Sequence, residues 1–276
     1  MKSDKDHSNS NRVRRVDVDT GVITTVVGNG SGIFEDGVLA LKTGLWGLWS
    51  VVLDRFDNIY IPESTNRVRC IDSSTGIIKT VVGSASNKLG DGGLAIMAAI
   101  DRPHGVAVDR YGNIFVADTS NNRIRKVDAS NGIITTIAGT GESGFNSDGI
   151  LATDARLSSP HDVVVDDQSN IYIPETGTHR VRRVDGKTGI VSTVAGTGES
   201  GFSGDGDLAV EAYLNAPHSV HLDKMGNIFV IDTLNYRVRK IDIESGVINT
   251  VAGGGTAGLG DGGLAVEAQV APHGAA

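Results

Sequence analysis

Short apolar runs alternate with turn residues along the whole chain. In one stretch, the apolar run 105–109 is followed by the turn residues 109–113 and by a second apolar run, 114–117. Apolar runs of this length around a turn of Asp, Gly and Asn are typical of a β-hairpin. A second pair of runs, 123–128 and 133–137, is rich in β-branched residues and also encloses a turn. The pattern predicts a unit of four antiparallel strands.

This unit recurs with a fixed period. An Arg-x-Arg motif recurs every 55–57 residues, and an Asp-Gly pair has nearly the same spacing. The motifs begin at Arg12, Arg67, Arg123, Arg180 and Arg237, and the pairs begin at Asp36, Asp91, Asp148, Asp205 and Asp261. Four short strands repeated every 40 to 60 residues or so, without long helices, are typical of β-propeller blades. The sequence therefore predicts an all-β protein, a β-propeller of four-stranded antiparallel blades.

The chain is expected to hold about four complete blades and a half blade, because the first two strands of the unit occur four times and the last two occur five times. We expect a disordered polar N-terminus over residues 1–10 and a propeller over 11–276. The expected units are 11–47 (partial), 48–102, 103–159, 160–216, 217–271 and the start of another at 272–276. A helical turn is expected before each new unit. Unpaired blade edges favour self-association.

Residues 103–128 carry a recognisable motif. They include Pro-His-Gly-Val-Ala-Val-Asp, Gly-Asn-Ile-Phe-Val-Ala-Asp and Asn-Arg-Ile-Arg-Lys. This motif resembles the NHL repeat, and the resemblance covers residues 11–276 in five copies. The Gly-Asp-Gly connector resembles that of long-period, bacterial-type members. The resemblance implies a propeller of the six-bladed, TolB-like type, although this chain supplies fewer than six blades.

Composition and charge narrow the function classes. With 39% hydrophobic and 21% charged residues, the chain is expected to fold. A net charge of −8 argues against nucleic-acid binding, since nucleic-acid binders cluster Lys and Arg on one face. The longest nearly apolar run, 93–100, is far shorter than the roughly 20 residues that cross a bilayer, and residues 1–10 lack the apolar stretch of a secretory signal. We expect a soluble protein without a membrane span, and the sequence assigns no compartment.

Histidines follow proline at the expected starts of several inner strands. They are His104, His161, His218 and His273. If the blades surround one axis, these imidazoles gather at a channel mouth, where neutral ring nitrogens bind zinc and leave a position open for water. Alternatively, each histidine is structural and caps the turn into the strand, while the proline fixes its approach. The repetition favours the structural interpretation, because repeats also copy structural residues.

The same histidines give a weaker resemblance to the peptidylglycine amidoglycolate lyase propellers, which also have His after Pro at inner-strand starts. That resemblance implies zinc ligands from alternate blades and lyase chemistry. Alternate blades here offer His104 with His218, or His161 with His273 and Trp49 at the third place. Neither set is complete, and the catalytic tyrosine of the lyase has no equivalent.

An acidic residue ends the second strand of each complete blade, four or five residues before the Arg-x-Arg motif. The expected ion pairs are Glu63 with Arg67, Asp118 with Arg123, Glu175 with Arg180 and Asp232 with Arg237. Acids and arginines at this spacing, repeated in every blade, predict structural salt bridges rather than an anion-binding site.

Two further features bear on ligands. The Asp- and Gly-rich loops 144–149 and 204–207 offer oxygens to calcium, but they lack the ordered spacing of an EF-hand, so a turn is favoured. In the first complete blade, Trp46 and Trp49 replace the small and His residues of the other copies. Tryptophan is common at binding hot spots and also fills irregular space. Both interpretations stay open.

The sequence favours a non-enzymatic binding or scaffold module, since no serine-nucleophile elbow and no phosphate-binding loop is present. Its expected binding face holds the Pro-His strand starts and the Gly-Asp-Gly connectors, and it meets a protein or other ligand. The candidate binding residues are Trp46, Trp49, His104, His161 and His218. The alternative is a zinc-assisted lyase or hydrolase with ligands His104, His161, His218 and His273. No cofactor is certain, and calcium is less expected than zinc.

Overall fold

The structure, a computed structural model, describes residues 11–84, 88–256 and 258–272. Contacts divide the chain into two units. The first holds the described residues up to Ile114 together with Val127–Thr135, and the second holds Phe115–Lys126 together with the described residues from Thr136 onward. Within the described ranges, all regular structure consists of β-strands and short 3-10 helices. The predicted all-β class is confirmed.

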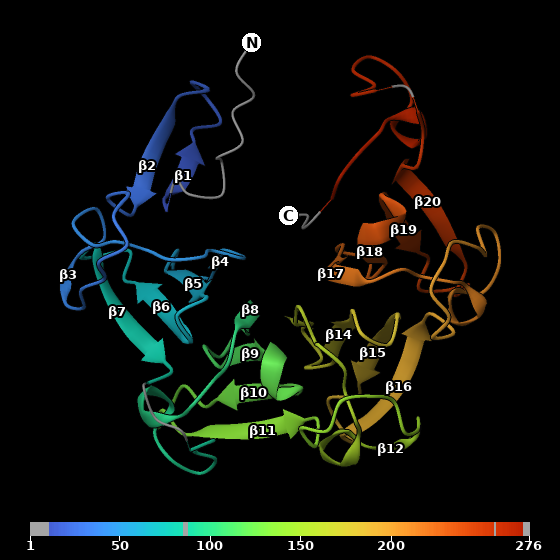
Figure 1. The fold of residues 1–276 in the computed structure, drawn as a ribbon. Coiled ribbons are helices and arrows are strands. Elements are labelled where there is room, and N and C mark those ends of the chain that lie inside the picture. Colours follow the sequence, from blue (N-terminus) through green and yellow to red (C-terminus); the bar gives the residue numbers. More distant parts are fainter. Residues whose placement is uncertain (1–10, 85–87, 257, 273–276) are drawn as a thin grey trace. The chain divides into compact units, whose positions relative to one another are not determined.

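The first unit contains a β-hairpin and a five-stranded antiparallel sheet (Figure 1). The hairpin consists of β1 (Val13–Val16) and β2 (Ile23–Val27), and it is the predicted half blade. The sheet has the order β3-β7-β6-β5-β4. Its strands are β3 (Val38–Leu39), β4 (Val52–Leu53), β5 (Ile59–Glu63), β6 (Arg67–Ile71) and β7 (Ile77–Val82). The 3-10 helix η1 (Ala95–Met97) and strand β8 (Pro103–Val108) follow.

A further sheet has four strands in the order β11-β10-β9-β8. Its other strands are β9 (Ile114–Asp118), β10 (Arg123–Val127) and β11 (Ile134–Ala138), with the 3-10 helix η2 (Thr119–Asn121) between β9 and β10. These strands lie where the apolar runs of residues 105–137 predict them. The four-stranded blade is thereby confirmed.

The second unit contains a five-stranded and a four-stranded sheet. The sheet β12-β16-β15-β14-β13 is formed by β12 (Ile150–Leu151), β13 (Val164–Val165), β14 (Ile171–Glu175), β15 (Arg180–Val184) and β16 (Ile190–Ala195). The sheet β17-β18-β19-β20 is formed by β17 (Pro217–Leu222), β18 (Ile228–Asp232), β19 (Arg237–Ile241) and β20 (Ile248–Gly253). The 3-10 helices are η3 (Ala152–Asp154), η4 (Ala209–Glu211), η5 (Thr233–Asn235) and η6 (Ala265–Glu267). Those at Ala95, Ala152, Ala209 and Ala265 are the predicted helical turns between repeats.

The first strand of the blade differs in length between copies. It has six residues in β8 and β17 but only two in β4 and β13. In the β13 blade, pairing begins at an isolated bridge between Pro160 and Glu175 and is then interrupted. There the Asp162 carboxylate accepts a hydrogen bond from the Val163 backbone N–H at 2.8 Å. This local bond competes with the hydrogen bonds between the strands, and β13 therefore begins only at Val164.

Aspartate and asparagine fix the turns of each blade. Asp223 Oδ1 accepts hydrogen bonds from the backbone N–H groups of Met225 and Asn227, both at 2.9 Å, which closes the turn between β17 and β18. Asn227 Oδ1 in turn accepts the N–H of Ile243 at 3.1 Å and so ties this turn to the next one. The same arrangement recurs at Asp54, Asp109 and Asp166. Side chains that bond nearby backbone groups are the reason that Asp and Asn mark turns in the sequence.

The outer edge of each complete blade is covered by the chain segment that precedes the blade. We call these segments connectors; each has the sequence Asp-Gly-x-Leu-Ala, and they are residues 36–40, 91–95, 148–152, 205–209 and 261–265. Strand β3 of the first connector pairs with β7, and β12 of the third pairs with β16. The second and fourth connectors form single bridges, Leu94 to Ile133 and Leu208 to Val247. A blade edge that would otherwise be open is thus protected.

Buried apolar residues lie between neighbouring blades of each unit. In the first unit they include Val27, Ala40, Leu45, Ile61 and Ile78. In the second unit they include Val181, Ala209, Leu214, Val230 and Ile248. The connector alanines and the fourth-strand isoleucines belong to these cores, so the repeat motif itself supplies the packing. Within the described residues, no helix is long and apolar enough to cross a membrane.

Candidate functional site

In the first unit, the start of the inner strand forms an aromatic stack. His104 follows Pro103 in β8, and its ring centroid lies 4.2 Å from that of Trp49. Ser50 Oγ donates a hydrogen bond to the His104 carbonyl at 3.2 Å. His104 is buried, whereas Trp49 keeps 53% of its surface exposed and Trp46 keeps 51%. Stacking on His104 holds the Trp49 ring in place while much of it stays accessible.

The second unit repeats the stack with two histidines. The ring centroids of His161 and His218 lie 4.2 Å apart, and both residues are partly exposed. His161 is positioned by its backbone N–H, which donates to the Pro174 carbonyl at 3.1 Å, and His218 belongs to β17. Two imidazoles in contact offer ring nitrogens and a flat surface to a ligand.

A carboxyl group, that of Asp162, follows His161 in the sequence, and Ser219 follows His218. Asp162 accepts a hydrogen bond from Ser219 Oγ at 2.6 Å. Desolvation raises the pKa of Asp162 to about 6, and the Ser219 hydroxyl partly opposes this shift. The group therefore titrates within the same pH range as an ordinary histidine.

The raised pKa makes stability depend on pH. Because the Asp162 pKa rises from its ordinary value of 3.8 to about 6, the folded state binds this proton more tightly than the unfolded state does. The resulting stabilisation is present below about pH 4 and is lost as pH rises through about 6. Asp162→Asn should therefore raise the free energy of unfolding at pH 7 by about 1–3 kcal/mol and flatten its fall between pH 4 and 6.

Urea unfolding of the Asp162→Asn variant at pH 4, 5, 6 and 7 measures this effect. Asp167→Asn, at an exposed neighbouring residue, is the matched control. A wild-type protein and an Asp162→Asn variant with parallel pH profiles would contradict the assignment.

The expected four-histidine metal site is only partly described. His273 lies outside the described residues. Within the described part of the chain, no group of three or more His, Cys, Asp and Glu side chains lies close enough to hold a metal ion. What the structure brings together is one Trp–His pair and one His–His pair, each within its own unit. Two such stacks have the chemistry of a binding surface, with flat rings and polar edges.

The acids that end the second strands face the second arginine of each Arg-x-Arg motif. We expected these acids to pair with the first arginine, and the structure differs in this respect. The pairs are Arg69 with Glu63 at 3.7 Å, Arg125 with Asp118 at 3.3 Å, Arg182 with Glu175 at 3.5 Å and Arg239 with Asp232 at 4.0 Å. All four arginines are fully buried. Both arginines of a motif point to the same face of the strand because they are two residues apart, and the register places the acid opposite the first one, as Glu175 lies opposite Arg180. The second arginine differs in being fully buried, and it is the one that forms the ion pair.

Connector aspartates supply a second carboxylate to this buried layer. Asp36 lies 2.8 Å from Arg69, Asp148 lies 2.8 Å from Arg182, and Asp205 lies 2.6 Å from Arg239. The calcium hypothesis concerned the loops that contain Asp148 and Asp205, whose carboxylates here bind arginine. Desolvation raises the pKa of Glu175 to about 7 and that of Asp232 to about 6, against the opposing effect of the arginines.

In three of the motifs the first arginine has a different partner, a phenylalanine just before the connector. The guanidinium carbon lies over the phenylalanine ring in three pairs: Arg67 over Phe34 at 4.0 Å, Arg180 over Phe145 at 4.2 Å and Arg237 over Phe202 at 3.7 Å. The sequence analysis missed these cation–π pairs. Their signal is a phenylalanine two or three residues before the connector aspartate in three of the five repeats.

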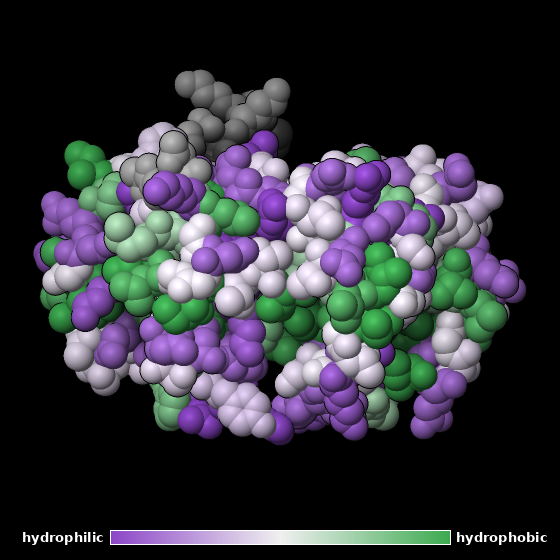
Figure 2. All heavy atoms as spheres, turned by 90° about the horizontal axis from the view of Figure 1, so that it is seen from below, coloured by the Kyte–Doolittle hydropathy of each residue, from purple (hydrophilic) through white to green (hydrophobic). Residues whose placement is uncertain are grey.

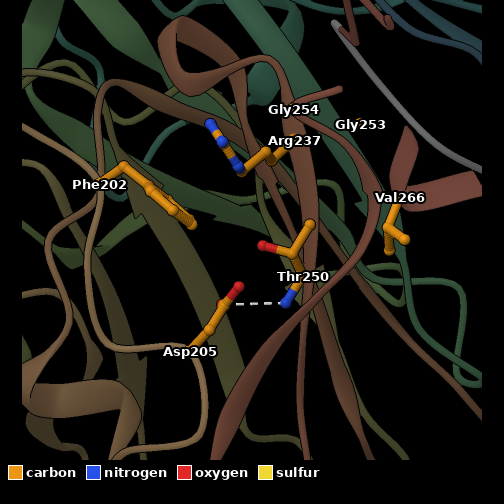
Figure 3. Close-up of a pocket in the computed structure, with 7 residues that line it drawn as sticks. All are labelled: Phe202, Asp205, Arg237, Thr250, Gly253, Gly254 and Val266. Atoms are coloured by element: carbon orange, nitrogen blue, oxygen red, sulfur yellow. Dashed lines mark hydrogen bonds between the residues drawn. The ribbon is translucent and has the colours of Figure 1, made fainter. Parts of the chain in front are cut away.

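A shallow pocket of about 260 Å³ opens beside one of these pairs (Figure 3). It is lined by Phe202, Asp205, Arg237, Thr250, Gly253, Gly254 and Val266. Asp205 Oδ1 accepts the Thr250 N–H at 2.9 Å and also binds Arg239, while Arg237 lies over Phe202. The Asp205 carboxylate is therefore engaged within the blade.

Comparisons with known proteins agree with the repeat. The family model "Teneurin NHL domain" matches residues 85–147. Protein SUPPRESSOR OF QUENCHING 1, chloroplastic, from Arabidopsis thaliana is 26% identical over 247 residues, which cover 85% of this chain and 23% of the relative. NHL repeat-containing protein 2 from Homo sapiens is 22% identical over 271 residues, which cover 87% of this chain and 37% of the relative. The chain thus matches less than half the length of these relatives.

A solved structure supports the fold. One chain of a crystal structure of a nidogen/laminin complex aligns with a TM-score of 0.58 at 14% identity, over 87% of this chain and 71% of that chain. The likeness at this identity concerns the fold alone. The repeat, the four-stranded blades and the named relatives together support an NHL-repeat β-propeller, the kind of protein to which this chain is similar.

Proposed function

We propose that the chain is a non-enzymatic binding module that holds a partner protein at the Pro-His ends of its inner strands. The observation that carries the proposal is the half-exposed Trp49 stacked on a buried histidine. An anchored aromatic ring loses little conformational freedom on binding, and tryptophan is common at binding hot spots. The nidogen/laminin neighbour, a protein of similar fold solved in a complex, supports protein as the class of ligand.

Exposed side chains also lie at the corresponding end of the last complete blade, in the second unit. Leu234 and Tyr236 are each 55% exposed in the turn between β18 and β19. This turn is fixed near the start of β17, because the Leu234 N–H donates to the Asn215 carbonyl at 3.1 Å. The surface seen in Figure 2 mixes apolar with polar residues. The exposed Leu–Tyr pair thus adds apolar area to the Pro-His strand end of the second unit.

Tyr236 also has a strained backbone. Its φ is 55°, in the left-handed region, where the equivalent residues are Asn66, Asn122 and His179. Asn tolerates this region, whereas a bulky aromatic residue there is an outlier. Asn66 and Asn122 additionally accept the backbone N–H groups of Arg102 and Ser159, both at 2.9 Å. A tyrosine that replaces a favourable asparagine at an exposed turn points to selection for binding rather than for stability.

Tyr236→Asn should therefore separate stability from binding. We expect a gain of about 1 kcal/mol in the free energy of unfolding, because left-handed strain is relieved. The same change should weaken partner binding by about tenfold or more, since an exposed aromatic anchor is lost. Thermal unfolding and quantitative affinity capture with the immobilised chain measure the two effects. A stabilised variant that captures its partners as wild type does would contradict the role of Tyr236.

Trp49→Ala tests the central anchor in the same capture experiment. We expect capture to fall about tenfold, with a loss in unfolding free energy of about 1 kcal/mol or less, because the ring is half exposed. Phe56→Ala is the matched control: Phe56 is 62% exposed but lies in the turn between β4 and β5, at the other end of the strands. Equal capture by wild type, Trp49→Ala and Phe56→Ala would exclude this face as the binding surface.

A further inference from the structure

The first arginine of the Arg-x-Arg motif is held differently in the last complete blade. In the blade before it, Arg180 donates hydrogen bonds to two backbone carbonyl groups, those of Thr178 and Thr197. The same two bonds occur one blade earlier. Arg237 donates from Nη1 to the Asn235 carbonyl at 2.7 Å, and its Nε and Nη2 groups have no hydrogen-bond partner among the residues that the structure describes. One edge of this guanidinium is therefore unused within the blade.

A glycine in the loop after the fourth strand is the local cause. Gly254 stands where the two preceding repeats have Thr140 and Thr197. A Cβ added at Gly254 would lie 2.4 Å from Nε and 2.7 Å from Nη2 of Arg237, so only glycine leaves room for the guanidinium at this place. The guanidinium carbon also lies 3.7 Å from the centroid of the Phe202 ring. Figure 3 shows the guanidinium between the ring and the Gly253–Gly254 segment, and this packing fixes its plane.

The pocket beside Arg237 has a second unused polar group. The hydroxyl oxygen of Thr250 is buried without a hydrogen-bond partner, and in Figure 3 it points toward the Phe202 side of the pocket. The equivalent hydroxyls of Thr80 and Thr193 are unpartnered too, so the unused arginine edge is what distinguishes this blade. Asp205, which also lines the pocket, lies 2.6 Å from Arg239 and is neutralised by it. The pocket thus offers donors whose charge is not cancelled locally.

The walls of the pocket are as accessible as their equivalents one repeat earlier. Phe202 is 42% exposed and Phe145, in the preceding blade, is 39% exposed. Val266 is 43% exposed and its equivalent Val210 is 44% exposed. The access to this site therefore belongs to the repeat, whereas the unused arginine edge comes from Gly254.

We propose that this pocket binds the carboxylate group of a small ligand that carries a short apolar side chain. The Nε–H and Nη2–H groups of Arg237 form the parallel pair of donors that a carboxylate accepts, and the Thr250 hydroxyl adds a third donor. Phe202 and Val266 supply apolar wall. The volume of about 260 Å³ is below the roughly 300–1,000 Å³ of sites for drug-sized ligands, so it suits a ligand of few atoms.

Free short-chain acids and the C-terminal residue of a peptide both present this chemistry. NMR titration of the ¹⁵N-labelled chain with isobutyrate tests the site, and it should give saturable shifts of the Gly254 and Thr250 amide signals and of the Arg237 Nε–H signal. Isobutyramide, the neutral analogue, should give none. Arg237→Lys keeps the charge but loses the paired donors and should weaken binding at least tenfold. Arg180→Lys is the matched control and should bind as wild type does, because the donors of Arg180 are occupied.

A short peptide that ends in valine, with a free or an amidated C-terminus, separates the two sources. Binding of the free-acid peptide that is tighter than that of isobutyrate identifies chain ends as the ligand, and weaker binding identifies free acids. Thr250→Val keeps the side-chain shape and should weaken isobutyrate binding about threefold without loss of stability, since the removed hydroxyl has no partner.

Four results would overturn the proposal. They are shifts that grow without saturation, equal shifts with isobutyramide, equal shifts with chloride, which would show an adventitious ion only, and wild-type affinity in a folded Arg237→Lys variant. If Arg237→Lys does not fold, wild-type affinity of Thr250→Val decides against the site instead. No residue of the proposed partner-binding face lines this pocket, so the two proposals can fail independently.

Discussion

Replacing Arg182 by methionine is expected to lower the free energy of unfolding by about 3–5 kcal/mol, the range for breaking a buried ion pair by removing one partner. Arg182 is fully buried, lies 2.8 Å from Asp148 and 3.5 Å from Glu175, and donates to the Ser147 carbonyl at 3.0 Å. Methionine fills much of the same volume but leaves the Glu175 carboxyl group without its cation. Urea unfolding at pH 7 measures the loss.

Two further variants test whether the loss of stability comes from the buried ion pair. Arg183→Met removes a partly exposed arginine that lies 3.3 Å from Asp185, and it should cost about 1 kcal/mol or less. Adding Glu175→Gln to Arg182→Met removes the stranded carboxylate, so the double variant should recover part of the loss. The loss should also be smaller at pH 5 than at pH 8, because the pKa of Glu175 is raised to about 7 and the protonated group needs no cation. Equal losses for Arg182→Met and Arg183→Met would contradict a structural role of the buried layer.

The second large effect is expected at Gly139, where Gly139→Ala should destabilise the protein by about 3 kcal/mol or more. Its φ is 91°, and an added Cβ would lie 2.2 Å from the Asn122 carbonyl oxygen and 3.0 Å from the Arg123 Cα. Both neighbours are backbone atoms, one in the turn before β10 and one at the first residue of β10, so they cannot rotate away. Relief requires a shift of the fourth strand or of the turn.

Gly149→Ala is the matched control for this prediction. Gly149 also has a positive φ, 79°, but nothing lies within 4 Å of an added Cβ. Only the conformational strain applies there, about 1–2 kcal/mol. The difference between the two variants in thermal or urea unfolding isolates the steric contribution. Variants of equal stability would show that the close approach at Gly139 does not constrain the blade.

Much of the fold could be predicted from the sequence because each structural motif occurs in several copies of the repeat. The Asp-x-x-Gly-Asn turn at Asp223 predicts a hairpin, and the side chains of Asp223 and Asn227 form the turn in the structure. The alternating apolar runs locate the strands within a few residues. The strand after Asp162 begins later than the apolar pattern predicts. The reason is a hydrogen bond from the Val163 N–H to the Asp162 side chain, which the apolar pattern does not reveal.

The site is less predictable because it depends on which residues face each other across strands. Sequence spacing brings Glu175 near both Arg180 and Arg182, and the strand register even places Glu175 opposite Arg180, so only the deeper burial of Arg182 distinguishes it. The connector aspartate Asp148 reaches that arginine from 34 residues away, which no local pattern shows. By contrast, the strand-start histidines and Trp49 are singled out by the repeat itself, since deviations from a repeated motif are visible in the sequence.

Hydrogen exchange of the chain alone and with a captured partner protein tests the binding proposal most directly. We predict that the partner protects the backbone around Trp46–Ser50 and around Leu234–Tyr236, where the exposed aromatic side chains lie. The turns at the other strand ends, 54–58 and 223–227, should exchange as they do in the free protein. Protection confined to those turns, with Trp49 and Tyr236 unaffected, would contradict the account.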